Sequence, residues 1–319
     1  MAKRTISSSP HILGKDTTTK IMLDVIIALI PAIIASVIFF GFRALLVVLT
    51  CSISSVLCEF ICRKVMKRNN TIGDLSAVVT GVLLALNLPV NIPLWMAVFG
   101  SIVAIVVVKQ FFGGLGQNFV NPAITARIIL MLCFAGAMTS WVTPNYKEHI
   151  DGLTGATPLG ILSTGVGEMP TFLEMLLGVR AGSIGETSVI ALLLGGIYLI
   201  IKKVISPIIP VTFIGTVFVL TFLKGFDVNF ALYHILSGGL FLGAIFMATD
   251  YVTSPITKWG KVIFGIGCGA ITVAIRLFGS LPEGVSYSIL LMNILTPHID
   301  NLTLPKYFGK VKEVKNGKN

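Results

Sequence analysis

Charged residues are scarce in this sequence. Only 12% of its 319 residues are Asp, Glu, Lys or Arg, 55% are hydrophobic, and the mean hydropathy is +0.92. Ordinary globular domains carry about 25% charged residues, so this composition excludes a soluble globular domain and predicts an integral membrane protein. An apolar signal-peptide core is also missing from residues 1–20, which are polar and basic. The N-terminal tail is therefore expected to stay in the cytoplasm uncleaved.

Common signatures of metal and nucleotide sites are missing as well. The five cysteines form no C-x-x-C pair, and the four histidines show no H-E-x-x-H spacing. Cys58 and Cys62 share a helix face, where packing is the ordinary role and a share in an intersubunit cluster is the alternative. The glycine-rich stretch FFGGLGQN lacks the G-x-G-x-x-G spacing. It favours a broken helix or close helix packing beside a cavity over a phosphate site.

Long apolar runs occupy most of the chain. A helix of about 20 apolar residues crosses about 30 Å of hydrocarbon, and windows of roughly that size predict ten transmembrane helices. We therefore expect an all-α membrane protein. The predicted spans are 22–41, 42–62, 74–90, 93–113, 120–138, 187–203, 207–224, 231–250, 260–279 and 284–300.

The distribution of basic residues predicts the orientation, because cytoplasmic loops collect Lys and Arg. With the N-terminus inside, the outer segments hold few of the 24 basic residues, and Arg127 lies within a span. Both termini are therefore predicted in the cytoplasm, and the net charge of +10 calls for no nucleic-acid partner. The outer basic residues are Arg43, Lys147, Arg180, Lys224 and Arg276.

The sequence also indicates an internal duplication. The segment that starts at Phe99 aligns with the segment that starts at Phe264, and Phe112-Gly113 then corresponds to Phe278-Gly279. A repeat of five helices places the second copy upside down, which is the inverted-repeat plan of many transporters, with the functional centre between the halves. The predicted division is an N-terminal tail 1–21, a first repeat 22–138, an outer segment 139–186, a second repeat 187–300 and a basic C-terminal tail 301–319.

The outer segment contains an unusual polar stretch, DGLTGATPLG, which begins at Asp151. Its glycines favour turns, and Thr157 before Pro158 is expected to be extended, so a surface turn is the plain interpretation. The pattern D-x-x-[ST]-G-A-T, however, arises by accident on the order of once in a thousand chains of this length. That rarity favours a dedicated function.

DGLTGAT resembles the flavinylation motif in membrane subunits of the Rnf and Na+-translocating NADH:quinone reductase complexes, the NqrB/RnfD family. The resemblance implies that a flavin transferase attaches FMN to Thr157 as a phosphoester, with Asp151, Thr154, Gly155 and Ala156 as the other motif positions. Gly155 and Ala156 are expected to leave the Thr157 hydroxyl unshielded. Further similar stretches, which extend the resemblance over the whole chain, are GGLGQNFVNPAITARI (113–128), MATDYVTSPIT (247–257) and PEGVSYSILLMNILTPHID (282–300).

The first span begins near residue 22, without a long N-terminal extension, which is similar to the RnfD branch of the family. Such a membrane subunit implies an ion-translocating complex of the bacterial inner membrane that passes electrons between reduced ferredoxin and NAD+ and moves Na+ or H+. Implied partners are the A, B, C, E and G subunits of Rnf, a flavin transferase and membrane lipid. A second, non-covalent flavin (riboflavin) occurs in the wider family, and the glycines of 113–116 are a candidate place for it. The transferase works outside, where the charge pattern also predicts Thr157.

Buried ionisable residues are the remaining candidates, because burying a charge in a membrane is costly. For each acid, pairing with a nearby Lys or Arg is the ordinary explanation and an ion pathway is the functional one. Asp250 is our first choice for Na+, since it ends a span among hydroxyl groups. Arg127 and Arg276 are candidates to hold a flavin or a partner's carboxylate, or to bridge the repeats. The acids at predicted inner ends of spans are Asp24, Glu59, Asp74, Asp250 and Asp300.

Two other functions stay open at this point. One is a secondary transporter of the inverted-repeat type without covalent flavin, and the other is a flavin-bearing subunit of a different extracellular electron-transfer chain. The chemical state of Thr157 separates the transporter from both flavin-bearing alternatives.

Overall fold

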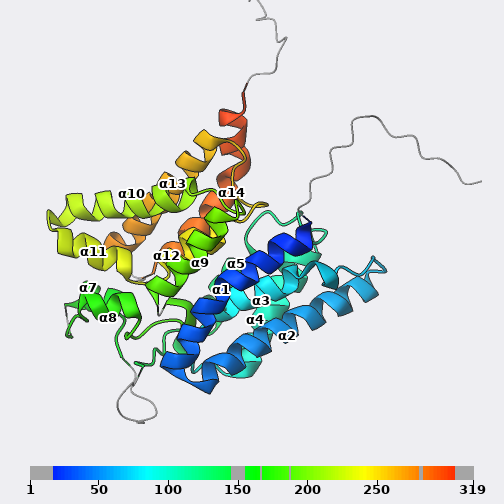
Figure 1. Ribbon diagram of the computed structural model, residues 1–319, viewed down its shortest axis with the longest axis horizontal. Coiled ribbons are helices and arrows are strands. Elements are labelled where there is room, and N and C mark those ends of the chain that lie inside the picture. Colours follow the sequence, from blue (N-terminus) through cyan, green and yellow to red (C-terminus); the bar gives the residue numbers. More distant parts are fainter. Residues whose placement is uncertain (1–16, 145–154, 166, 187, 280–282, 306–319) are drawn as a thin grey trace, which may run out of the picture.

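The computed structural model describes residues 17–144, 155–165, 167–186, 188–279 and 283–305 (Figure 1). Over these ranges the chain is helical and contains no strand. Several of the helices are apolar enough to cross a bilayer. The predicted class, an all-α multi-pass membrane protein, is therefore confirmed.

The helices fall into a first half, a second half and, between them, a short group that we call the outer group after its predicted location. The first half consists of α1 (Thr18–Phe40), α2 (Phe42–Val65), η1 (Ile72–Asp74), α3 (Ser76–Leu86), α4 (Leu94–Ile102), the π-helical η2 (Val103–Gln110), α5 (Pro122–Cys133) and α6 (Ala135–Met138). The outer group is α7 (Pro158–Thr164), α8 (Phe172–Leu177) and η3 (Ile184–Glu186). The second half consists of α9 (Val189–Ile201), α10 (Ile208–Gly225), α11 (Val228–Leu236), α12 (Leu240–Leu242), the π-helical η4 (Gly243–Met247), α13 (Lys258–Phe278) and α14 (Val285–Thr303).

Within the described ranges, the helices long and apolar enough to cross a membrane alone are α1, α2, α10 and α13. The window 231–250 is wrong as one continuous helix, because α11 and the α12–η4 segment meet at a bend of 65°. The window 120–138 is also interrupted, at Phe134 between α5 and α6. With 11 residues, α3 is about 16 Å long and reaches only halfway across the hydrocarbon. Hydropathy thus located the helical regions but not their breaks.

Equivalent helices of the two halves pack against each other. α1 contacts α9, and α5 contacts α14. Within the halves, α2 contacts α3, α4 and η2, while α10 contacts α11 and α13. A duplicated five-helix unit would give this pattern, and the boundaries of its two copies stay a prediction.

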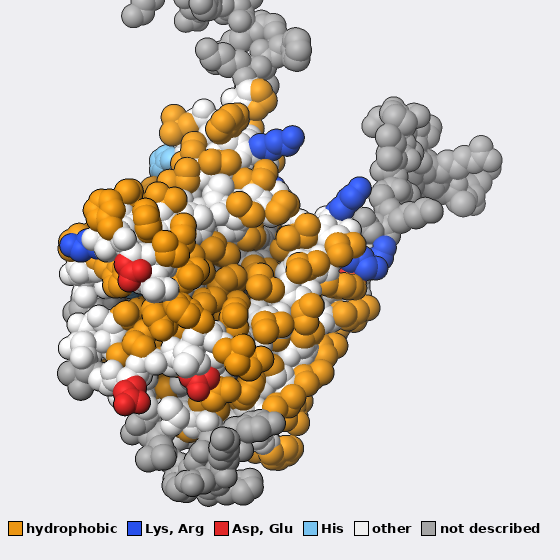
Figure 2. Space-filling view, turned by 60° about the vertical axis from the view of Figure 1, so that its left-hand side comes forward, with side chains coloured by type: hydrophobic (Ala, Val, Ile, Leu, Met, Phe, Trp, Pro, Cys, Tyr) orange, Lys and Arg blue, Asp and Glu red, His pale blue; other side chains and the backbone are white. Residues whose placement is uncertain are grey.

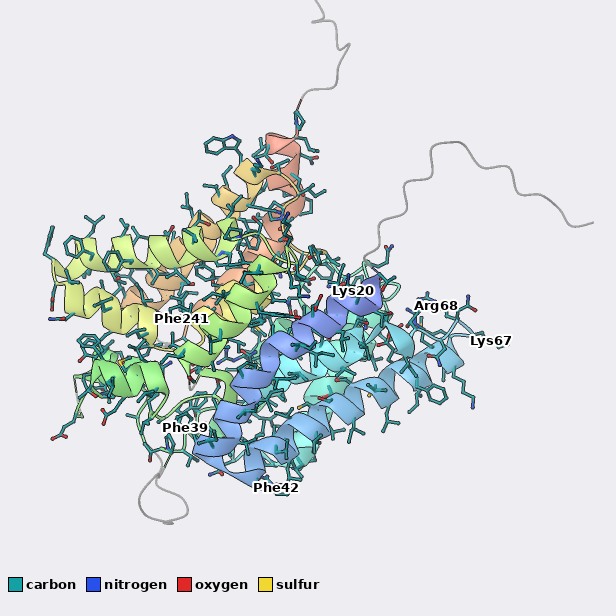
Figure 3. All side chains as sticks on the ribbon, viewed as in Figure 1. Lys20, Phe39, Phe42, Lys67, Arg68 and Phe241 are labelled. Carbon is teal, nitrogen blue, oxygen red and sulfur yellow. The ribbon has the colours of Figure 1, made fainter. Side chains whose placement is uncertain are left out.

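The two ends of the molecule differ in charge. α1 begins at the end where α14 finishes, while α7 and α8 lie at the opposite end (Figure 1). Lys20, Lys67 and Arg68 lie at the first end, and Phe39 and Phe42 lie far from them (Figure 3). Hydrophobic side chains cover the surface between the ends (Figure 2). With 23 residues, α1 is about 34 Å long, which matches the hydrocarbon thickness of a bilayer.

Close packing of α1 and α9 depends on a glycine. A Cβ atom at Gly195 of α9 would lie 2.1 Å from the carbonyl oxygen of Ala28 in α1. That oxygen belongs to the backbone, so only a displacement of one helix could make room. Gly195 therefore sets the distance between the first helices of the two halves.

The substitution Gly195→Ala should destabilise the chain by about 1–3 kcal/mol, because it overpacks this contact. Gly215→Ala in α10 is the matched control, since a Cβ there meets no atom within 4 Å. Thermal unfolding of the purified full chain in detergent measures both variants. We expect a lower midpoint for Gly195→Ala and an unchanged one for Gly215→Ala, and equal midpoints would contradict this packing.

Candidate functional site

Thr157 begins a helix. Its backbone is extended, with φ −68° and ψ 153°, as expected for a residue before proline, and Pro158 is the first residue of α7. The backbone N–H of Gly160 donates to the Thr157 hydroxyl oxygen over 3.1 Å. Thr157 is only 9% exposed. The expectation of an unshielded hydroxyl is therefore wrong: its oxygen caps α7 in a nearly buried position.

The neighbouring motif residues explain this packing. A Cβ atom at Gly155 would lie 2.6 Å from the Thr143 methyl carbon, and the Gly155 N–H donates to the Trp141 carbonyl over 3.1 Å. Gly155 thus permits a close approach, while Ala156 is exposed. Two further motif residues, Asp151 and Thr154, lie outside the described residues.

Beneath α7 lies the break between α11 and α12. Gly238 stands at this break with φ +68°, a conformation that favours glycine. A Cβ atom there would lie 2.8 Å from Leu159 Cδ1 and 3.1 Å from Arg276 Nη2. Thr157 is therefore two residues from a direct contact with the bent helix of the second half.

Two buried arginines donate hydrogen bonds to the backbone carbonyl groups at the end of α11. Arg276 donates to the His234 carbonyl over 2.6 Å and to the Ser237 carbonyl over 3.2 Å. Arg180 donates to the Leu236 carbonyl and, over 2.6 Å, to that of Glu186. The guanidinium groups thus take the place of the hydrogen bonds that a continuous helix would make. The sequence marks Arg180 only as an outer charge and assigns it no site.

Arg127 of α5 connects the two halves. Its guanidinium donates to the Asn87 side-chain oxygen over 2.9 Å and to the Ser286 hydroxyl over 3.1 Å. It also forms ion pairs with Glu283 and, over 3.6 Å, with Glu186. Of the roles considered from the sequence, bridging the repeats is the one that the geometry shows for Arg127. We call Arg127, Arg180, Arg276, Glu186 and Glu283 the outer charge cluster.

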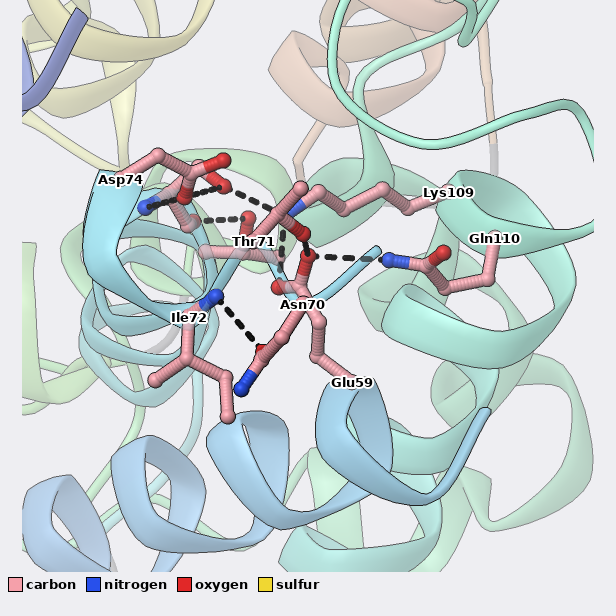
Figure 4. Close-up of polar contacts among 9 residues, drawn as sticks. Glu59, Asn70, Thr71, Ile72, Asp74, Lys109 and Gln110 are labelled. Atoms are coloured by element: carbon pink, nitrogen blue, oxygen red, sulfur yellow. Dashed lines mark hydrogen bonds and ion pairs between the residues drawn. The ribbon is translucent and has the colours of Figure 1, made fainter. Parts of the chain in front are cut away.

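A second buried network lies in the first half (Figure 4). The Glu59 carboxylate and the Lys109 ammonium group are 2.9 Å apart, and both side chains are at most 2% exposed. Lys109 also donates to the Ser76 hydroxyl over 2.6 Å. Thr71 and Gln110 each donate to the other Glu59 oxygen over 2.9 Å. Pairing with a lysine, the ordinary explanation for Glu59, is confirmed.

The other acids have local partners. Asp74 accepts hydrogen bonds from the backbone N–H and hydroxyl of Ser76, the first residue of α3. Asp24 accepts from the Tyr198 hydroxyl over 2.7 Å, which links α1 to α9. Asp300 accepts from the Ile256 N–H over 3.0 Å. These contacts explain the three acids without an ion.

Asp250 differs, because it lines a cavity between the halves. Its carboxylate accepts from the Thr253 hydroxyl over 3.3 Å and from the Val252 N–H over 3.4 Å. The cavity has about 790 Å³ of empty space, open mouth included. Its walls come from α1, α3, η2, α9 and η4, and its polar lining includes Ser76, Thr80, Lys109, Asn118, Asn121 and Asp250.

The glycine-rich stretch leads into this cavity. Gly113, Gly114 and Gly116 all have positive φ, and Leu115 lines the cavity wall. The chain between η2 and α5 is therefore irregular here, as the sequence predicts for a broken helix beside a cavity. Asn121 then caps α5 by accepting from the N–H groups of Ala123 and Ile124.

Cysteine and histidine supply no metal site in the described ranges. Cys58 and Cys62 are half-buried free thiols on α2. Across these ranges no three His, Cys, Asp or Glu side chains lie close enough together to hold a metal ion. A cluster shared with another subunit has no further support here.

Comparison with known proteins decides the family. Residues 5–309 match the model of the NQR2, RnfD, RnfE family. The chain belongs to this family. Among its relatives is the D subunit of the Na+-translocating ferredoxin:NAD+ oxidoreductase complex of Acetobacterium woodii, which is 50% identical with 98% of each chain covered. The D subunit of the proton-translocating ferredoxin:NAD+ oxidoreductase complex of Clostridium ljungdahlii is 47% identical, with 96% of each covered.

A third relative is the D subunit of the ion-translocating oxidoreductase complex of Stutzerimonas stutzeri, at 40% identity over 93% of each chain. The family resemblance inferred from the motifs is therefore confirmed. Since two of these relatives carry different ions in their names, similarity to them leaves the choice of Na+ or H+ open.

Lys109→Met should destabilise the protein by about 3–5 kcal/mol, because it leaves the Glu59 carboxylate buried without its cation. Adding Glu59→Gln should restore much of that loss, since the remaining groups are neutral. Thermal unfolding of the two single variants and the double variant measures the coupling. Additive effects of the two substitutions would show that the pair is not a unit.

Proposed function

We propose that this chain is the RnfD subunit of an ion-translocating ferredoxin:NAD+ oxidoreductase complex and carries FMN as a phosphoester on Thr157. The observation that carries the proposal is the complete motif DGLTGAT in a chain of this family. The names of the relatives support the complex, because each is a D subunit. In such a complex the chain acts as a redox subunit and depends on partners for catalysis.

The position of Thr157 is compatible with the modification. In the transfer, the Thr157 hydroxyl attacks a flavin-bearing diphosphate, loses its proton and releases the other half as a monophosphate. The ester oxygen remains a hydrogen-bond acceptor, so the Gly160 N–H keeps a partner. Because Thr157 is nearly buried, the transferase requires residues 155–157 to leave their packing against Thr143. Modification before this segment has packed satisfies that requirement.

The FMN supplies the redox chemistry, and the chain supplies attachment and electrostatics. The outer charge cluster lies beneath α7, where Leu159 and Arg276 both approach Gly238. It contains three arginines and two glutamates, so its ionised form has a net positive charge. Positive charge in a low-dielectric region stabilises negative charge on a phosphate or on a reduced ring.

The inner cavity is the site that we propose for the second flavin, a non-covalent riboflavin. The amide groups of Asn118 and Asn121 can donate and accept, as the edge of a flavin ring requires, and Val79, Leu83 and Phe246 are apolar walls for its faces. Lys109 and Asp250 add one cationic and one anionic group to the same lining.

We place the subunit in the bacterial inner membrane with Thr157 on the outer face. Support comes from Lys20, Lys67 and Arg68, which gather at the end opposite α7 and α8 (Figures 1 and 3). Electrons then travel between a flavin held in the cavity and one held near the outer face. The A, B, C, E and G subunits of Rnf, the flavin transferase and membrane lipid are the partners that we propose, and Na+ and H+ are the candidate coupling ions.

Substituting Thr157 should abolish covalent flavin. Thr157→Ala lacks the attacking oxygen, whereas Thr157→Ser keeps both that oxygen and the cap. Loss of the cap costs about 0.5–2 kcal/mol, which makes Thr171→Ala the matched control, because Thr171 caps α8 in the same outer group. Each variant is co-produced with an active flavin transferase, and in-gel flavin fluorescence of the denatured chain is measured.

We expect fluorescence in wild type and Thr171→Ala and none in Thr157→Ala. Thr157→Ser should retain a signal, which slower modification would weaken. Covalent flavin in Thr157→Ala would place the attachment elsewhere. No covalent flavin in any variant, with the transferase active on another substrate, would favour the transporter alternative.

Filling the cavity should remove the second flavin. Thr80→Phe adds a ring to the cavity wall. Thr50→Phe in α2 is the matched control, because Thr50 lies outside the cavity. Both threonine hydroxyls donate to the backbone carbonyl four residues earlier. Flavin released by denaturing the washed, folded chain is measured by chromatography. Riboflavin should be released from wild type and Thr50→Phe but not from Thr80→Phe, and equal release from all three would exclude this site.

A further inference from the structure

The outer charge cluster brings two carboxyl groups together at the junction of the halves. Glu186 belongs to η3, and Glu283 precedes α14. The Glu186 residue is 4% exposed, and the Glu283 side chain is 13% exposed. Both carboxyl groups lie against the same guanidinium nitrogen, Arg127 Nη2, with Glu283 in an ion pair and Glu186 at 3.6 Å. Two carboxyl groups held this close repel each other when both are ionised, which favours one proton on the pair.

One oxygen of this pair is left without a hydrogen bond. Glu186 Oε1 has no hydrogen-bond partner among the residues that the structure describes. It lies 3.6 Å from Arg127 Nη2, and the position of a Cβ atom on Gly239 is 3.3 Å away. The other oxygen, Oε2, lies 3.1 Å from the corresponding position on Gly182. The negative charge of Glu186 is therefore balanced mainly by the ion pair with Arg127.

The charged surroundings decide which carboxyl group holds the proton. Burial raises the pKa of Glu283 to about 8, with the Glu186 charge adding to the effect and Arg127 opposing it. Burial also raises the pKa of Glu186, but Arg127, the contact with Glu283 and Arg180 outweigh it and hold that pKa below its usual value. The other facing groups are Arg276 of α13, which also acts on Glu283, and His234 of α11, which lies beside Arg276. At neutral pH the proton therefore belongs to Glu283.

We propose that Glu186 and Glu283 form a proton-binding site at the outer junction of the two halves, where Glu283 holds one proton against Glu186 and Arg127. Release breaks the O–H bond of Glu283, passes the proton to water and leaves two carboxylates facing Arg127. The ligand is a proton rather than a metal ion, because a proton needs only one carboxyl oxygen, whereas a metal ion needs several ligand atoms. Among the described residues, no three His, Cys, Asp or Glu side chains lie close enough together to hold a metal ion.

Proton release changes both the junction and its charge. Arg127 ties α5 to Glu283 and Ser286 at the start of α14, so the new carboxylate strengthens a contact between the halves. The cluster also loses one unit of positive charge beneath α7. If Thr157 carries FMN, as proposed above, reduction of that flavin and protonation of Glu283 favour each other. The proton site itself exists with or without the flavin.

Infrared spectroscopy of the full chain in lipid nanodiscs tests the site. The wild type should show a carboxylic-acid C=O band that shifts in D2O and disappears with a midpoint near pH 8, the pKa of Glu283. Glu283→Gln, which resembles the protonated side chain, should lack this titrating band. Glu174→Gln is the matched control, since Glu174 is exposed in the same outer group and hydrogen bonds from Thr171 lower its pKa. It should retain the band.

Two further variants test whether the titrating band depends on Glu186 and whether it depends on Thr157. Glu186→Gln should move the midpoint down by at least about one pH unit, because it removes the neighbouring negative charge. Thr157→Ala should keep the band unchanged, which separates this proposal from flavinylation. A titrating band that survives in Glu283→Gln, or a wild type without one, would overturn the proposal.

Stability gives an independent readout with a defined sign. Glu283 has an ordinary pKa of 4.5 and a pKa of about 8 in the folded chain, so the folded state binds more protons between these values. The contribution of Glu283 to the free energy of unfolding therefore falls as pH rises through this window. The unfolding midpoint of wild type should fall relative to that of Glu283→Gln over the same range. Parallel pH profiles of the two proteins would contradict a proton on Glu283.

Discussion

Backbone groups that are freed inside a membrane must find partners within the protein, and this constraint governs the arrangement of charge in the fold. The chain breaks its helices in several places, and polar side chains occupy the breaks. Asp74 binds the first N–H group of α3, and Asn121 caps the beginning of α5. Arg180 and Arg276 bind the last carbonyl groups of α11. Some of the scarce charged residues thus lie where the backbone needs partners.

This use of charge also produces two buried networks with different properties. In the inner network, Glu59 and Lys109 neutralise each other, and hydroxyl and amide groups donate to or accept from the pair. The outer charge cluster has more arginines than glutamates and leaves Glu186 Oε1 without a hydrogen bond in the described structure. The inner network adjoins the large cavity, and the outer one lies beneath the motif helix α7. The paired charges of Glu59 and Lys109 suit a rigid wall, whereas the excess of arginines and the carboxylate oxygen without a hydrogen bond suit a site that exchanges protons.

The sequence predicted the helical regions well, because hydropathy measures what a lipid-facing helix requires. It missed the break at Ser237–Gly239, since the flanking residues are as apolar as a continuous span, although Gly238-Gly239 was an available signal. It also missed that Thr157 caps a helix, although Thr before Pro is a common helix start. The outer charge cluster could not be predicted from the sequence, because Arg127, Glu186 and Glu283 are far apart in sequence and only the fold brings them together. The motif itself could be recognised without the fold, since its residues are consecutive in the sequence.

Mass spectrometry of the wild-type chain, purified from its native host or co-produced with an active flavin transferase, tests the proposed flavin attachment most directly. We expect the intact mass to exceed that of the sequence by one FMN minus one water. Fragmentation of the peptide that contains residues 151–157 should place this addition on Thr157. An unmodified peptide, with the transferase active on a control substrate, would contradict covalent FMN on this chain.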